Sequence, residues 1–233
     1  MNPLNASFSL AEQLIILSHR TEKPNYAIPV STLSIGICGA MMMDLVKAEN
    51  IRLEEGKVHI DRFETDLSEA HQMMLDRMAK SKKLRKPSYW ISSNNMIAHK
   101  FRKVYEEQLV EAEVLRIERK KFLFIPYKIT HLEKPETHEW FRDALRTQVF
   151  ASNHLDPSYK PFLGLIQGCK LYKLIAEGKS EVKEAKSKIT ELMAKDPLSK
   201  GMETAMEEMQ AAMIATIIAS TTAANVATMS VNS

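Results

Sequence analysis

The residues best placed to bind a ligand lie in a stretch that carries only positive charge. Between positions 77 and 103 the chain has nine Lys and Arg residues and no Asp or Glu, whereas its overall formal net charge is +3. The densest part is the run of Lys82, Lys83, Arg85 and Lys86, which we call the basic loop. A surface of one charge attracts anions, so the stretch predicts contact with phospholipid headgroups, nucleic acid or an acidic partner. A solvated lysine-rich loop is the competing interpretation.

Membrane attachment needs few such residues. Near an anionic bilayer each Lys or Arg contributes about 1 kcal/mol, so roughly four or five engaged side chains suffice for reversible binding. Tyr89 and Trp90 follow the basic loop directly and suit an interface, although a Trp beside Ile91 is also typical of a core position. We therefore expect the basic loop to face a membrane.

Other residue types that carry chemistry are not arranged for it. The seven histidines are scattered, with no His-Glu-x-x-His pattern and no Cys/His array, so no metal site is expected. The sequence has no glycine-rich phosphate loop and no Gly-x-Ser-x-Gly elbow. We therefore expect neither an enzyme nor a bound cofactor.

Two similar segments position the basic stretch between them. Residues 45–54 (LVKAENIRLE) recur as residues 109–118 (LVEAEVLRIE), with six of ten positions identical. Each copy ends a helical pattern, enters an alternating strand and returns on a second strand, at 57–60 in the first copy and at 121–125 in the second. A helix that leads directly into a β-hairpin, twice, indicates an internal duplication.

The second hairpin leaves the class of partner open. Its predicted turn is basic, Arg119-Lys120-Lys121, between apolar strands. A helix followed by a hairpin is also typical of winged-helix modules that bind DNA, which makes nucleic acid the competing partner. Glu106 and Glu107 on the preceding helix argue against DNA, because acidic side chains repel phosphates. Nucleic acid is therefore the less favoured partner.

Composition favours a single domain over residues 1–233. With 45% hydrophobic residues, only 7 Gly and no Gly/Ser-rich linker, the chain can bury one core without an obvious boundary. The predicted fold class is mainly α: one helical domain with two helix–β-hairpin units. Its repeat-like halves cover about 31–60 and 95–130, and a helical C-terminal part covers about 135–228.

Capping residues mark where helices begin. Ser9 with Glu12 forms a capping box, and Asp66 with Glu69 forms a second one. Asn94 or the next residue is expected to cap the helix that precedes the second hairpin.

Two apolar segments resemble membrane spans in composition. The first, a helix capped by Ser31 or Thr32 and running to about Ala48, is apolar nearly all round, which is typical of a buried helix. The second, 211–227, contains several Ser, Thr and Asn residues and is short for a bilayer. Both are predicted to be core helices.

The two cysteines indicate a reducing compartment. Cys38 and Cys169 lie in apolar helical patterns, and two cysteines make no disulfide framework, so free thiols are expected. Residues 1–8 lack the charged and apolar regions of a signal peptide. We therefore expect a cytosolic protein.

These segments resemble the Golgi phosphoprotein 3 family, which includes a yeast vacuolar-sorting homologue and bacterial relatives. Residues 8–14 (FSLAEQL) look like its opening helix, and residues 39–45 (GAMMMDL) look like its buried second helix. The most specific match runs over 102–115 and continues over 118–124 (ERKKFLF). The resemblance spans nearly the whole chain.

The resemblance implies a peripheral membrane adaptor. Members bind phosphatidylinositol 4-phosphate at the cytosolic face of the Golgi and link glycosyltransferase tails to retrograde vesicle coats. The implied partners are an anionic membrane surface, protein cargo tails and a second copy of the chain, because the family's hairpin takes part in oligomerisation. Here that hairpin carries Arg119, Lys120, Lys121 and Phe122. A bacterial member would remain in the cytosol.

The resemblance also assigns a headgroup site. The family's pocket uses one Trp and three Arg, which fall at Pro29, Cys38, His99 and Arg102 of this chain. Arg102 is retained, with His99 and Lys100 as partial substitutes, so these three are the candidate headgroup-binding residues. Arg suits a phosphate because its planar fork donates two hydrogen bonds at once.

Two further observations bear on this assignment. Arg102 has a competing structural role as the partner of Glu106, four residues later, in an exposed ion pair. Glu49 and Glu113 stand where the family has a helix-ending Gly, so both helix ends are expected to close differently.

Overall fold

Helices make up most of the fold, as the sequence predicts. The computed structural model of the chain describes residues 8–63, 67–152, 154–195 and 207–219. Its α-helices are α1 (Leu10–Ser18), α2 (Val30–Lys47), α3 (Glu69–Ala79), α4 (Pro87–Asn95), α5 (Ala98–Glu111), α6 (Pro135–Arg146), α7 (Lys160–Gly168) and α8 (Gly178–Lys195), with a further helix at 207–219. Short π and 3-10 segments are η2 (Thr147–Ala151), η3 (Pro157–Tyr159) and η4 (Tyr172–Leu174). Two antiparallel hairpins are formed by β1 (Ile51–Glu54) with β2 (Lys57–Ile60) and by β3 (Leu115–Phe122) with β4 (Ile125–Leu132).

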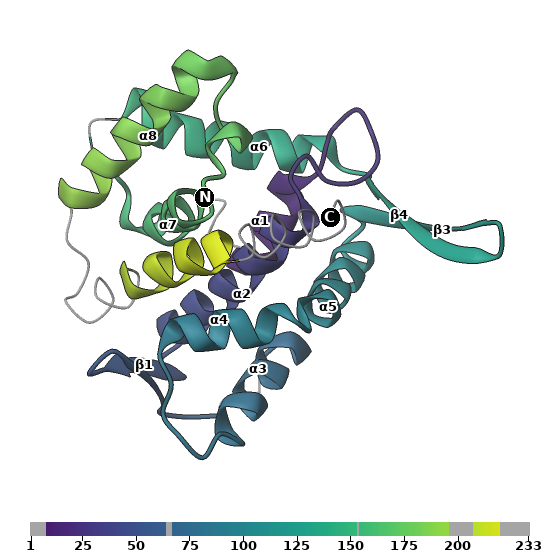
Figure 1. Cartoon of the computed structure of the whole chain (residues 1–233). Coiled ribbons are helices and arrows are strands. Elements are labelled where there is room, and N and C mark those ends of the chain that lie inside the picture. Colours follow the sequence, from purple (N-terminus) through teal and green to yellow (C-terminus); the bar gives the residue numbers. More distant parts are fainter. Residues whose placement is uncertain (1–7, 64–66, 153, 196–206, 220–233) are drawn as a thin grey trace, which may run out of the picture.

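Helix α2 lies at the centre, and the two hairpins project on opposite sides of the molecule in Figure 1. Helices α1, α4, α5 and α7 all pack against α2. Within the described part of the chain, α2 is the one helix long and apolar enough to cross a membrane by length and composition, and most of it is buried inside the protein. The prediction of a core helix is therefore confirmed, as is the mainly α fold class with two helix–hairpin units.

The helix starts follow the predicted caps in part. Ser9 caps α1 with the full capping box: its hydroxyl accepts the Glu12 N–H at 3.3 Å, and the Glu12 carboxylate accepts the Ser9 N–H at 2.8 Å. Helix α3 is capped by Ser68; the predicted cap Asp66 lies outside the described residues. Helix α2 has Pro29 at its N-cap position and no side-chain cap, so the prediction of a Ser or Thr cap is wrong there. The fixed φ of proline suits this position without any side-chain hydrogen bond.

The two helix–hairpin units end their helices in the same way. Glu49 after α2 and Glu113 after α5 both have a left-handed backbone, with φ of 56° and 58°. In each unit the following N–H donates to the carbonyl five residues back at 2.9 Å. This is the Schellman motif, which Gly normally closes. The expectation of a different closure is wrong, because Glu adopts the conformation of the Gly; the internal duplication stays a prediction.

Replacing Glu113 with Gly is expected to raise the free energy of unfolding by about 0.5–1 kcal/mol, because Gly adopts positive φ without a Cβ clash. The ion pair that would be lost, with Lys134 at 3.5 Å, is exposed and contributes little. Urea denaturation followed by circular dichroism measures the change. Glu107→Gly, inside α5, is the matched control, because it also loses an exposed ion pair, with Lys103, and it should lower stability by about 0.5–1 kcal/mol. Equal destabilisation by both substitutions would contradict the argument.

The second hairpin is longer than the first, and its turn is apolar. Strands β3 and β4 pair over eight residues, up to Phe122 opposite Ile125, whereas β1 and β2 pair over four. The cations at 119–121 lie within β3, and the turn consists of Leu123 and Phe124. The predicted basic turn is therefore wrong. The aromatic residue Phe122 and the β-branched residue Ile125 favour paired positions, so β3 extends one residue past the last cation, Lys121.

The sequence patterns do not predict helix α4. Asn94 and Asn95 end α4 instead of capping α5, whose N-cap residue is Ile97, with no side-chain hydrogen bond. Asn94 is buried, and its Oδ1 accepts a hydrogen bond from Arg77 Nε at 2.8 Å. Trp90 is 5% exposed and belongs to the core rather than to an interface. The predicted cap is therefore wrong, because the Asn94 side chain bonds to Arg77 on α3 and not to the first turn of α5.

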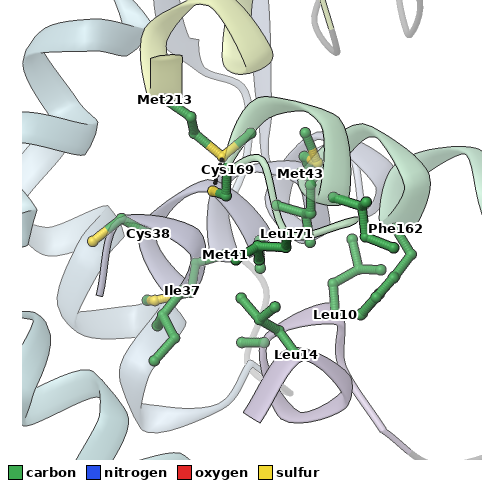
Figure 2. Packing of buried hydrophobic residues seen from close by; sticks show 14 of the residues in the cluster. Leu10, Leu14, Ile37, Cys38, Met41, Met43, Phe162, Cys169, Leu171 and Met213 are labelled. Atoms are coloured by element: carbon green, nitrogen blue, oxygen red, sulfur yellow. Dashed lines mark hydrogen bonds between the residues drawn. The ribbon is translucent and has the colours of Figure 1, made fainter. Parts of the chain in front are cut away.

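The helix at 207–219 covers the core between α2 and α7. Met213 fills the space left by Gly39 and Gly168, where an added Cβ would lie 2.3 Å and 2.7 Å from its side chain. Figure 2 shows Met213 above Cys169, with the two sulfur atoms 3.6 Å apart. Ala212, Met213 and Thr216 are buried, so the prediction of a core helix holds through 219; residues 220–227 lie outside the described residues.

Both cysteines are buried and free, as predicted. Burial raises the pKa of the Cys38 and Cys169 thiols to about 12. Because the thiolate is the reactive form, both side chains act as small apolar residues at neutral pH.

Candidate membrane-binding surface

Four consecutive apolar side chains are exposed at the end of the second hairpin. Phe122, Leu123, Phe124 and Ile125, which we call the apolar tip, each expose more than half of their surface, and Phe124 is 97% exposed. Figure 1 shows β3 and β4 extending away from the helices. A contiguous exposed apolar patch on a soluble protein marks a surface that binds a membrane or a protein.

The backbone of the apolar tip is strained. Leu123 and Phe124 form a two-residue turn with φ of 45° and 71°. A hairpin turn with two positive φ values strongly favours Asn and Gly, and the first hairpin has Glu55-Gly56 at the equivalent positions. Bulky side chains in this region cost about 1–3 kcal/mol each, and such strain concentrates at functional sites. The chain therefore keeps Leu and Phe here at a cost to its stability.

The strands next to the apolar tip carry cations. Arg119, Lys120, Lys121 and Lys128 are all exposed. Lys120 pairs with Glu118 at 3.2 Å, whereas Arg119 and Lys121 have no ion-pair partner among the residues that the structure describes. Apolar side chains next to free cations suit a bilayer surface, where the apolar groups enter the acyl boundary and the cations meet lipid phosphates.

The base of the hairpin is fixed to the loop that follows α1. The Thr130 carbonyl of β4 accepts the Asn25 N–H at 2.8 Å, and the Thr130 N–H donates to Asn25 Oδ1 at 3.3 Å. Thr130 Oγ1 lies 3.0 Å from His19 Nε2. Burial lowers the pKa of His19 to about 4, so the ring is neutral at physiological pH. The hairpin is thus held firmly at its base while its tip is free.

A buried carboxylate connects α5 to the same hairpin. Glu106 is 1% exposed and accepts hydrogen bonds from Tyr26 Oη at 2.6 Å and from Lys128 Nζ. Arg102 Nε lies 3.3 Å from Glu106 Oε1, and its guanidinium lies 6.0 Å from the centre of the Tyr26 ring. The Arg102 side chain is 15% exposed. The ion pair with Glu106 is therefore present, but it is buried and not exposed as the sequence alone indicates.

The three candidate headgroup residues differ in their surroundings. Arg102 pairs with Glu106, which also pairs with Lys128. The side chains of His99 and Lys100 are exposed and make no hydrogen bond or ion pair with any described residue. Cys38, where the family has another Arg, is fully buried on α2. The headgroup role of Arg102, His99 and Lys100 therefore stays a prediction.

The basic loop contacts the first hairpin, formed by β1 and β2. The Arg85 carbonyl accepts the Val58 N–H of β2 at 2.9 Å, and the Arg85 guanidinium lies 4.6 Å from the centre of the Tyr89 ring. Lys82, Lys83 and Lys86 are exposed. Because the two hairpins project on opposite sides in Figure 1, the structure does not bring the basic loop next to the apolar tip.

A polar cluster around the buried His71 joins residues far apart in the chain, and no sequence pattern predicts it. His71 is buried, with Nδ1 2.7 Å from Ser68 Oγ and 3.3 Å from Tyr105 Oη, and with Nε2 3.5 Å from Asp44 Oδ2. The order Ser-His-Asp is that of a nucleophilic triad. However, Ser68 Oγ accepts the His71 N–H as the cap of α3, and Asp44 accepts the Leu10 N–H at 3.2 Å. These groups hold α1, α2, α3 and α5 together. No group of three His, Cys, Asp or Glu suited to a metal ion occurs among the described residues.

Comparison with known proteins identifies the family. No curated protein matches the chain. The family model described as Golgi phosphoprotein 3 (GPP34) matches residues 10–209, from the first residue of α1 into the helix at 207–219. The match includes α2, both hairpins and the Arg102–Glu106 pair. The chain therefore belongs to the Golgi phosphoprotein 3 family.

Proposed function

We propose that this protein is a peripheral membrane adaptor that docks on anionic phospholipid surfaces through the apolar tip of its second hairpin. The observation that carries the proposal is the exposed, strained Leu123-Phe124 turn flanked by free cations. Membership of the Golgi phosphoprotein 3 family agrees with a Golgi-associated adaptor rather than an enzyme.

The size of the apolar tip suits reversible attachment. Full burial of a Leu or Phe side chain contributes about 1.5–3 kcal/mol, and each cation near an anionic surface adds about 1 kcal/mol. Leu123 and Phe124 together with Arg119 and Lys121 therefore supply on the order of 5–8 kcal/mol before the costs of association. Without those costs, a value of this size would correspond to a Kd of roughly 1–200 μM, and the costs weaken the affinity further, so the attachment is reversible.

Charge, more than the position of a phosphate, is proposed to select the membrane. Arg102 is paired with Glu106, and the other family pocket positions hold Pro29, Cys38 and His99. A phosphatidylinositol 4-phosphate headgroup would then be bound as one anionic lipid among others.

A second copy of the chain and protein cargo tails are the further proposed partners of an adaptor. Contact between two tips in solution would bring the unpaired Arg119 and Lys121 of each copy together, and like charges facing each other are destabilising. Anionic lipid neutralises these charges. We therefore propose that any assembly through the hairpin, including Lys120 and Phe122, forms on the membrane rather than before it.

Co-sedimentation with vesicles tests the proposal. The full chain is mixed with phosphatidylcholine vesicles and with vesicles that also contain phosphatidylserine or phosphatidylinositol 4-phosphate, matched for total charge, at several salt concentrations. We expect binding to both anionic vesicles that weakens as salt rises, because salt screens exposed charges. Equal sedimentation with neutral and anionic vesicles would refute the proposal.

A further inference from the structure

A cavity of about 580 Å³ opens beside the base of the second hairpin. It lies between the segment 17–27, the first turns of α6 and η4, and its lining includes Arg20, Lys23, Arg142 and Lys173. Volumes of this size are typical of small-molecule sites. His19, which also lines the cavity, contacts Thr130 of β4 at 3.0 Å. Thr130 is five residues from the end of β4 at the apolar tip, so the cavity lies roughly 17 Å along the strand from that tip.

The cavity carries an excess of available positive charge. Its four cations face two acids, Glu22 and Glu139. Among the described residues, Arg20, Lys23 and Lys173 make no ion pair, while Arg142 pairs with Glu177. Like charges that line one cavity repel one another, and a bound anion relieves this repulsion. The excess of unpaired cations in the lining therefore favours an anionic ligand.

A buried histidine completes the lining without adding charge. His138 is 9% exposed and lines the cavity, and its Nδ1 has no exposed surface through which a ligand could reach it. Burial, together with the neighbouring Arg142, lowers the pKa of His138, so the ring is neutral at physiological pH. Recognition of an anion therefore depends on the cations of the lining.

We propose that this cavity binds a small organic phosphate monoester through Arg20, Lys23 and Lys173. A phosphate alone fills a small part of the volume, so the remaining space holds the organic group. The ligand is either a soluble phosphate ester or a lipid headgroup that projects from the membrane; the lipid form rests on the proposed docking of the apolar tip. This site is separate from Arg102, which pairs with Glu106 and does not line the cavity.

Titration with soluble ligands tests the site without a membrane. Isothermal titration calorimetry compares glycerol 3-phosphate, inorganic phosphate and glycerol on the full chain. We expect glycerol 3-phosphate to bind and glycerol not to bind. Lys23→Gln with Lys173→Gln should weaken binding at least tenfold, because two charge-assisted hydrogen bonds are lost. Lys179→Gln with Lys183→Gln, at exposed positions of α8, removes the same charge and should change nothing. The site is overturned for soluble ligands if the two double variants weaken binding equally. It is also overturned if the unmodified chain does not bind glycerol 3-phosphate.

Vesicles then distinguish the two sources. Phosphatidic acid presents a phosphate monoester and phosphatidylserine does not, so the two are compared at equal surface charge. Stronger binding to phosphatidic acid that is lost in Lys23→Gln/Lys173→Gln, with phosphatidylserine binding retained, assigns a lipid headgroup. Calorimetric binding without this lipid preference assigns a soluble ester. If neither calorimetric binding nor the preference for phosphatidic acid is found, the inference is overturned. If the chain binds no vesicles at all, the proposed function is overturned, and the calorimetric result still decides the site for soluble ligands. All four lysines are exposed, so the variants are expected to fold.

Discussion

Replacing Glu106 with Gln is expected to lower the free energy of unfolding by about 3 kcal/mol. Glu106 is 1% exposed, accepts hydrogen bonds from Tyr26 and Lys128, and forms an ion pair with Arg102. Gln preserves the shape but removes the charge, so the guanidinium of Arg102 stays desolvated without a counter-ion. Removing one partner of a buried ion pair costs about 3–5 kcal/mol. Lys128 is 39% exposed and can turn to water, which places the loss at the lower end of this range.

The neighbouring residue supplies the control. Glu107 is 49% exposed and pairs with Lys103 at 3.6 Å, also on the surface of α5. Glu107→Gln is expected to change the free energy of unfolding by less than about 0.5 kcal/mol. Urea denaturation of both variants gives the comparison. If the two variants lose similar amounts of unfolding free energy, the effect comes from removing a negative charge from α5. It would then not come from leaving the buried Arg102 without its counter-ion.

This network changes how an Arg102 variant must be judged. Arg102→Ala leaves Glu106 buried with Tyr26 and Lys128 as its remaining partners, so a loss of folding stability is expected alongside any change in lipid binding. Weaker vesicle binding by this variant would not identify Arg102 as a headgroup ligand. The lysines beside the apolar tip and the cavity are exposed, and their variants separate binding from stability.

The sequence predicts what depends on local chemistry. The capping box at Ser9, the all-round apolar α2 and the two helix–hairpin units follow from patterns within about 20 residues. The helix α4 is missed because its signals are weak: Pro87 begins it, and its buried Asn94 bonds to Arg77 on α3. Asn before a helical pattern is a cap signal in the absence of that long-range partner.

The candidate surface is predicted less well for two physical reasons. Glu106 meets Tyr26 across 80 residues of chain, and His19 meets Thr130 across 111, so no spacing rule finds either contact. The apolar turn breaks a local rule instead, because Leu123-Phe124 is a poor choice for positive φ and the adjacent cations are better turn residues by polarity. Local reasoning fails where a sequence keeps strain for function.

The double substitution Leu123→Asn and Phe124→Gly is expected to abolish anionic vesicle binding while raising the stability of the fold. Asn-Gly is the favoured pair for a turn with two positive φ values, so the strain is relieved and the free energy of unfolding rises by about 2 kcal/mol or more. The same change removes two apolar side chains, of which Phe124 is 97% exposed. Their insertion contributes at least about 3 kcal/mol, so binding should weaken about a hundredfold or more.

Net charge is unchanged in this variant, which makes it a direct test of the apolar contribution. The complementary variant Arg119→Gln with Lys121→Gln keeps the apolar tip and removes two unpaired cations. It should lose most of the difference between anionic and neutral vesicles, because about 1 kcal/mol per cation is removed. Co-sedimentation gives the affinities and thermal unfolding gives the stabilities. If the Asn-Gly hairpin binds anionic vesicles as well as the unmodified chain does, the apolar tip is not the membrane anchor. If the variant is instead less stable, Leu123 and Phe124 are structural residues and their turn carries no strain for function.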